Sequence, residues 1–269
     1  IQKNPVLGGN QNGTIQIDYT KPIGKNSRIE LGERSYLMQF KSENDPTIQY
    51  MNQTEIPEIL LKNHFLFSQN VHGIYANYGT QLKSTGVQVG LRGEYFSYEG
   101  TVYQYNAKVK NSYLGLFPTL FLSQKITSKS DVNFNYARRV NRPNFYQLIP
   151  FIDVSNPQDT SMGNPDLKPE FIHATEFSYT NQYDKSNTFI GSVYYQYTSN
   201  LIQRFRRFND NGTTFSQNRN LATGITYGME LTNKMNLLSW WDATLNINIF
   251  RNKINGSNID PTVARSGYG

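Results

Sequence analysis

The chain has 269 residues, and its 26 Lys and Arg outnumber its 20 Asp and Glu to give a formal charge of +6. It has no cysteine, which excludes disulfides, thiolate metal sites and a cysteine nucleophile. No apolar run approaches the roughly 18 residues that a membrane-spanning helix needs, so an integral membrane protein of this sequence must cross as strands.

The dominant pattern along the chain is an alternation of apolar and polar residues, which indicates half-buried strands. The windows that show it are rich in Thr, Tyr, Val and Ile, which favours strand over helix. A single short helix is predicted around Ile56 to Lys62, with Pro57 in its first turn. About ten strands are predicted, near residues 13–21, 27–40, 64–79, 84–98, 113–126, 130–141, 170–181, 187–208, 213–235 and 240–254.

Each predicted strand has an apolar face and a polar face. Leu91, Phe134, Val193 and Ile247 represent the apolar face, which we expect to meet lipid. The polar face would line a lumen, and its expected members are Gln88, Arg92, Glu94, Asn133, Asn135, Arg139, Gln196, Glu230, Thr232, Asn246 and Asn248.

Short and long connections alternate along the chain. Long ones are predicted at 41–63, 99–112 and 141–169, and the fourth is a long hairpin with its tip at 209–212, where Asn211-Gly212 is a strong hairpin signal. Short turns at one end and long, extracellular loops at the other are typical of an up-and-down transmembrane barrel. The longest strands, 187–208 and 213–235, are expected to project beyond the bilayer. The fold class is therefore an all-β, antiparallel transmembrane β-barrel, with 1–269 as part of a single domain.

Catalytic and metal chemistry finds little support in the sequence. His64, His72 and His173 are far apart and lack metal-ligand spacing, so structural or surface roles are expected. The loop carboxylates of Asp153, Asp159 and Asp166 could bind calcium together with Asn156 and Asn164, but their spacing matches no known calcium loop and a solvated loop is the better interpretation. We expect no catalytic residue, no metal and no cofactor.

Arginines are the charges that point most clearly to a ligand. We expect them in the lumen or at its mouth, where guanidinium groups pair well with carboxylate or phosphate. The alternative is that they bind lipopolysaccharide phosphates or simply solvate the loops. The candidate ligand-binding residues are Arg92, Glu94, Arg138, Arg139, Arg142, Arg204, Arg206 and Arg207.

Three segments carry a family resemblance. Phe117-Pro118-Thr119-Leu120, then Asn135-Tyr136-Ala137-Arg138-Arg139-Val140-Asn141-Arg142-Pro143, then Gly163-Asn164-Pro165-Asp166-Leu167-Lys168-Pro169-Glu170 resemble TonB-dependent outer-membrane receptors and the outer-membrane β-barrel family close to them. The motif residues expected to be structural are Arg139, Asn141, Arg142, Pro143, Gly163, Asn164, Pro165, Leu167, Pro169 and Glu170.

The resemblance implies a plugged barrel of about 22 strands in the outer membrane of a Gram-negative cell. Such receptors take up an iron chelate, cobalamin or a glycan. The implied partners are outer-membrane lipid and lipopolysaccharide, TonB through an N-terminal region that is missing here, a small-molecule or glycan ligand, and a surface lipoprotein; nucleic acid is not expected. The chain is expected to be an internal barrel fragment without plug or terminal strands.

Two other functions are open on the sequence alone. The aromatic residues of a soluble or surface β-rich module could stack on glycans, as in an adhesin. An outer-membrane hydrolase ranks last, because no Ser–His–acid set is evident near a strand end.

Overall fold

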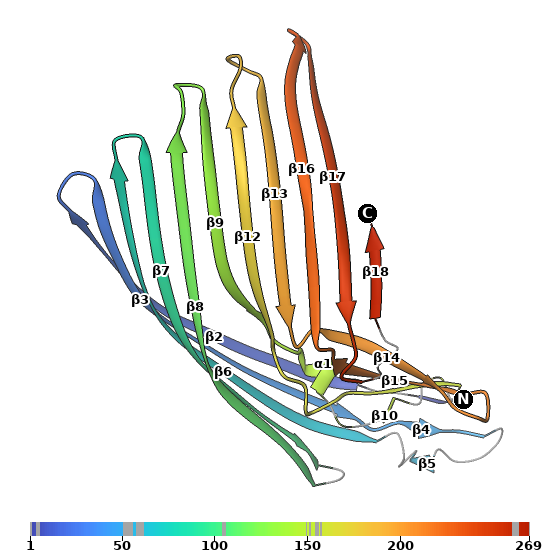
Figure 1. Ribbon diagram of the computed structural model, residues 1–269. Coiled ribbons are helices and arrows are strands. Elements are labelled where there is room, and N and C mark those ends of the chain that lie inside the picture. Colours follow the sequence, from blue (N-terminus) through green and yellow to red (C-terminus); the bar gives the residue numbers. More distant parts are fainter. Residues whose placement is uncertain are drawn as a thin grey trace.

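The computed structural model describes residues 2–3, 6–50, 56–57, 62–103, 106–148, 150, 152–153, 156, 158–259 and 264–268. Its main feature is an eleven-stranded antiparallel sheet, which confirms the predicted all-β fold. Figure 1 shows this sheet curving around one side of the molecule, with short turns at one end. The strand order in space is β18 (Ala264–Tyr268), β17 (Trp241–Asn255), β16 (Thr223–Leu238), β13 (Thr188–Ser199), β12 (Glu170–Asn181), β9 (Ser130–Asn141), β8 (Ala107–Lys125), β7 (Thr85–Val102), β6 (Asn63–Leu82), β3 (Ser27–Asn44) and β2 (Val6–Ile23).

Two smaller sheets lie at the other end, which we call the long-loop end (Figure 1). One has the order β10 (Ile152–Asp153), β11 (Asp159–Met162), β15 (Thr214–Asn220), β14 (Ile202–Phe208), and it includes a parallel pair, β11 with β15. The other joins β1 (Gln2–Lys3), β4 (Thr47–Ile48) and β5 (Ile56–Pro57). The single turn of helix α1 (Phe145–Leu148) lies between β9 and the four-stranded sheet. Among the described residues, no helix is long and apolar enough to span a membrane.

The apolar side chains change faces along β3, β6, β7 and β8, as β7 illustrates. In its first half, Val89 and Leu91 point outward and are 46% and 50% exposed, whereas Arg92 and Glu94 point to the concave face. In its second half the apolar side chains lie on the concave face, where Phe96 is only 2% exposed. The first half therefore suits hydrocarbon outside and a polar lumen inside, and the second half suits water outside.

The outward apolar residues form a continuous band across the sheet. Directly paired residues of an antiparallel sheet share a face. The register pairs exposed apolar side chains of neighbouring strands, so they form rows across the sheet. Trp240 lies in the short turn between β16 and β17, and Trp241 is the first residue of β17; both are exposed, as expected at a lipid–water boundary. An exposed apolar surface of this extent fits contact with lipid. The band includes Ile15, Ile17, Leu31, Ile74, Val89, Leu91, Leu114, Leu116, Phe177, Val193, Met229, Leu245, Ile247 and Ile249.

The buried core sits on the concave face at the long-loop end. There α1 and the segment after it cover the sheet: Phe145 packs on Phe40 and Phe65 with ring centroids 4.4 and 4.6 Å apart, and Leu148 joins Leu167 in the core. The core comprises Phe65, Phe67, Val71, Phe96, Tyr98, Val102, Leu148 and Leu167. Burying each large side chain contributes roughly 1.5–3 kcal/mol.

Several predicted boundaries were wrong at the long-loop end. The strand predicted at 187–208 divides into β13 and β14, and the one at 213–235 divides into β15 and β16. Asn200 causes the first break, because its φ of 55° lies in the left-handed region that interrupts a strand. The hairpin beyond it leaves the main sheet for the four-stranded one.

Other loop predictions also differ from the structure. Most of 99–112 is strand, because apolar residues such as Val102 and Val109 still find the core on the concave face. In the predicted loop 41–63, β3 continues to Asn44 before the chain turns away. The helix predicted at Ile56 to Lys62 is replaced at Ile56–Pro57 by strand β5, and 58–61 lie outside the described residues. The predicted loop 141–169 contains α1, β10 and β11.

We predict that Gly228→Ala destabilises the barrel whereas Gly13→Ala does not. A Cβ at Gly228 would lie 2.5 Å from the backbone oxygen of Ile249, and one at Gly13 would meet nothing within 4 Å. Overpacking at Gly228 should cost about 1–3 kcal/mol in urea unfolding of the full-length protein in detergent. Equal stability of the two variants would contradict the register of β16 and β17.

Candidate functional site

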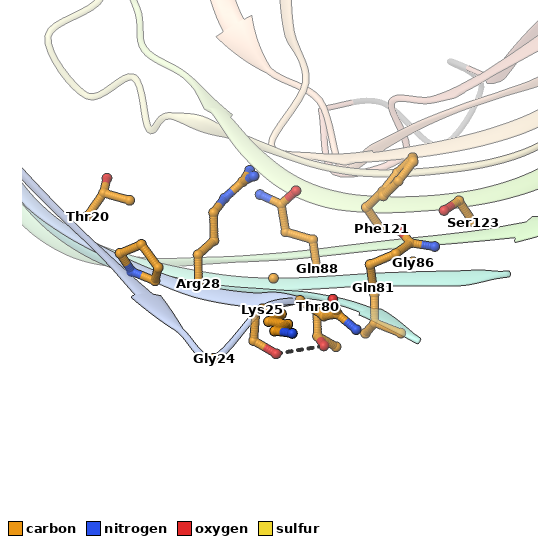
Figure 2. Close-up of a pocket in the computed structure, with 15 residues that line it drawn as sticks. Thr20, Gly24, Lys25, Arg28, Thr80, Gln81, Gly86, Gln88, Phe121 and Ser123 are labelled. Atoms are coloured by element: carbon orange, nitrogen blue, oxygen red, sulfur yellow. Dashed lines mark hydrogen bonds between the residues drawn. The ribbon is translucent and has the colours of Figure 1, made fainter. Parts of the chain in front are cut away.

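The concave face carries the polar residues predicted to line a lumen. The register places all of them on the face opposite the outward apolar band. Near the short turns this wall lines an open hollow of about 480 Å³, and Figure 2 shows Arg28 and Gln88 extending from the wall. A second hollow of about 530 Å³ lies farther along the wall and is lined by Gln88, Asn135, Arg139 and Gln196. The inner wall is thus polar and hollowed at several points.

Three of the predicted ligand-binding residues come together as a charged cluster, Arg92–Glu94–Arg142. Arg92 Nε lies 2.6 Å from Glu94 Oε1, and Arg142 Nη2 donates to Glu94 Oε2. Glu94 is only 7% exposed, and the Arg142 guanidinium also lies over the Phe96 ring, 5.0 Å from its centroid. The cluster ties the first residue after β9 to the wall at β7. It is internally paired, although its two cations exceed its one anion.

Arg138 and Arg139 point away from this cluster. Arg138 lies where β8 and β9 separate, since their pairing stops at Thr119, and its Nη1 donates to the carbonyl of Leu116 at 2.8 Å. Its guanidinium also lies 4.6 Å from the centroid of Phe171. Arg139 remains exposed on the concave face, in the second hollow. Adjacent residues in the sequence therefore have opposite surroundings.

Several residues of the family motif meet at one junction, whereas Arg139 and Arg142 lie outside it. Glu170, 6% exposed, accepts hydrogen bonds from Asn141 Nδ2 and from the backbone N of Ile202, both at 2.5 Å. Asn164 Nδ2 donates to the carbonyl of Asn218 at 3.0 Å. Asn220 Nδ2 donates to the carbonyls of Lys168 and Asn200 at 2.9 and 2.7 Å. The junction holds the ends of β9, β12, β14 and β15 together. Buried members that add apolar contact are Pro143, Gly163, Leu167 and Pro169.

The arginines of β14 divide between its two faces. Arg206 Nη2 pairs with Asp159 Oδ2 at 3.1 Å, and Arg204 is on the same face. Arg207 is on the opposite face and is exposed. Thr214 Oγ1 donates to Asp159 Oδ1 at 2.6 Å; this bond lowers the pKa of Asp159 below its ordinary 3.8, partial desolvation opposes it, and the charges of Arg206 and Arg204 lower it further. Asp159 is thus held as an anion between two strands.

The calcium interpretation of the loop carboxylates gains no support from their placement. Asp159 belongs to the β11–β15 pairing, and the backbone N of Asp166 donates to Asn164 Oδ1 at 3.0 Å in a local turn. In the part of the chain that the structure describes, no group of three or more His, Asp or Glu side chains could hold a metal ion.

A cavity that the sequence reasoning missed lies beside Arg204. It has a volume of about 470 Å³ and is lined by Arg204 together with Asn44, Tyr146, Gln217 and Asn218. These residues come from β3, α1, β14 and β15, so no local spacing could reveal it. The one available signal was the unusual run of amide residues from Gln217 to Asn220.

Comparisons with known proteins agree with this architecture. A family model for the outer membrane protein β-barrel family matches residues 1–268. No curated protein matches the chain in sequence.

Solved structures of larger outer-membrane proteins share the fold. The copper transporter OprC superposes with a TM-score of 0.68 at 12% identity, over 96% of this chain and 39% of that one. The ferric citrate transporter FecA in its unliganded form gives 0.64 at 13% identity, over 99% and 37%. The Serratia marcescens hemophore receptor HasR, in complex with its hemophore HasA and heme, gives 0.64 at 12% identity, over 94% and 42%. The chain thus spans about two fifths of the length of each.

We predict that Glu94→Gln releases the segment after β9. Loss of the carboxylate leaves the Arg92 and Arg142 guanidiniums facing each other in a partly buried site, which should cost about 3 kcal/mol. Limited proteolysis of the full-length protein should then cut within 143–169. The control is Glu30→Gln, which loses the ion pair with the exposed Arg28 but keeps an amide oxygen that can accept from Asn77, and it should change stability by less than about 1 kcal/mol. Unchanged protease resistance in Glu94→Gln would show that the cluster does not anchor the loop.

Acid should loosen the β14–β15 hairpin through Asp159. Because the folded-state pKa is lowered, its stabilisation is present above 3.8 and is lost as the pH falls through the folded value. Hydrogen-exchange protection of the hairpin amides should therefore be higher in the wild type than in Asp159→Asn at about pH 6, and the difference should disappear as the pH is lowered through the folded-state pKa of Asp159. A difference that persists in acid would assign the effect of the substitution to something other than charge.

Proposed function

The chain belongs to the outer membrane protein β-barrel family, and we propose that it forms part of the wall of a TonB-dependent receptor that imports a scarce nutrient across the outer membrane. The observation that carries this proposal is the pairing of an outward apolar band with a polar, hollowed concave face. A soluble module would leave that band in water, so the adhesin alternative is disfavoured.

The likeness to transporters and receptors supports the same conclusion. The three structures above are named for a copper transporter, a ferric citrate transporter and a hemophore receptor, and each covers more than nine tenths of this chain. The substrate of this protein is an iron chelate, cobalamin or a glycan in our proposal. Ligand would enter from the long-loop end, which we assign to the extracellular side.

The proposed partners follow from this topology. TonB would act through a region outside the present sequence, and a surface lipoprotein would meet the long-loop end. Lipopolysaccharide is a proposed partner of the outward face, where Arg251 and Lys253 follow Ile247 and Ile249 on the same side of β17. These cations lie just beyond the apolar band on the long-loop side, at the depth of lipid phosphates.

Deletion of the gene should abolish uptake of one nutrient. We expect the deletion strain to fail on an iron chelate, cobalamin or a glycan supplied as the limiting source, and to recover with the full-length gene. A dissipated proton gradient should abolish uptake in the complemented strain as well, because TonB transmits that energy. Normal growth of the deletion strain on all three nutrient classes would contradict the proposal.

A further inference from the structure

We propose that the 470 Å³ cavity beside Arg204 binds a carboxylate-bearing, polyhydroxylated small molecule, of which a sugar with a uronic acid group is the representative class. This inference rests on the proposed uptake function, whose substrate it narrows. The cavity volume is within the ~300–1,000 Å³ of typical small-molecule sites and suits one or two sugar rings.

An aromatic platform stands at the cavity. The Tyr146 ring is 74% exposed although it belongs to α1, which is otherwise anchored in the core. Its neighbour Phe145 is held between Phe40 and Phe65, and the Phe145 and Tyr146 ring centroids are 5.0 Å apart. The anchoring fixes the backbone of α1, so Tyr146 is presented to the cavity on a rigid base. An exposed aromatic face of this kind packs well against the C–H face of a pyranose ring.

The helix turn that carries Tyr146 is itself fixed by a capping box. Asn144 Oδ1 accepts a hydrogen bond from the Gln147 backbone N at 3.0 Å, and Gln147 Oε1 accepts one from the Asn144 backbone N at 2.9 Å. Asn164 N donates to the carbonyl of Gln147 at 2.6 Å, which ties α1 to the motif junction. Tyr146 is therefore already ordered, so ligand binding loses little conformational entropy there.

Amide side chains supply hydrogen bonds for hydroxyl groups. Asn44 contributes one amide side chain to the lining. Gln217 and Asn218 add two further amides to the lining. These groups favour a polyol over an apolar ligand.

Arg204 supplies the charge selectivity. Its neighbour Arg206 is already paired with Asp159, whereas Arg204 has no ion pair within 4.0 Å among the described residues. A carboxylate of the ligand would pair with the Arg204 guanidinium through a bidentate contact. Asp153 also lines the cavity, and its negative charge disfavours a ligand of higher charge such as phosphate. The lining therefore favours a carboxylate placed at Arg204 on a body of hydroxyls.

Calorimetric titration of the purified full-length protein in detergent tests this assignment. The probes are digalacturonate, its neutral counterpart galactobiose, and ferric citrate as a carboxylate without a sugar ring. Digalacturonate should bind. Arg204→Gln should lower the affinity for digalacturonate about tenfold, to the affinity for galactobiose. Tyr146→Ala should lower the affinity for both sugars. Arg207→Gln, on the opposite face of the same strand, is the matched control and should leave binding unchanged.

Several outcomes would overturn the inference. Failure of digalacturonate to bind would refute it, as would an equal loss in Arg207→Gln. Binding of ferric citrate alone, with dependence on Arg204, would overturn the sugar class. The deletion strain separates this failure from failure of the proposed function: if the strain still loses uptake of another nutrient, only the cavity assignment falls.

Discussion

Each long strand passes through two surroundings, hydrocarbon and water, and this constraint shapes the rest of the molecule. In hydrocarbon every backbone group must be paired, which the antiparallel ladder provides, and apolar side chains must face outward. Beyond the band the outward face meets water, and on β3, β6, β7 and β8 the apolar residues move to the concave face. On β7 the change falls between Tyr95, which is outward, and Phe96, which is inward and buried.

A sheet that turns an apolar face inward needs something to cover it. The segment after β9 does so with Phe145, Leu148 and Leu167, while Glu94 and Arg142 fix its beginning and Glu170 its end. The same cover carries Tyr146, and it builds one side of the cavity beside Arg204. The proposed ligand site is thus a consequence of how the long-loop end buries its core.

The local sequence pattern predicted the ranges of the strands well, but it did not predict which distant segments come into contact. The ranges 130–141 and 170–181 match β9 and β12 because period 2 and the flanking turns are local. The division at Asn200 depends on one left-handed residue, and the parallel pairing of β11 with β15 joins segments that are far apart in the chain. The contact between Glu94 and Arg142 spans 48 residues. Arg138 and Arg139 were both predicted to bind ligand, yet they lie on opposite faces of β9, and Arg138 donates to the Leu116 carbonyl where β8 and β9 separate.

A cysteine scan of β7 tests the change of faces most directly. The chain has no cysteine of its own, so each single substitution in the full-length protein reports one position. A maleimide that cannot cross lipid should label Gln88 and Arg92 but spare Val89 and Leu91. Past Tyr95 the labelled set should switch to Ser97 and Glu99, with Phe96 and Tyr98 protected by the core. Labelling of the outward positions along the whole strand, Val89 and Leu91 included, would contradict the account.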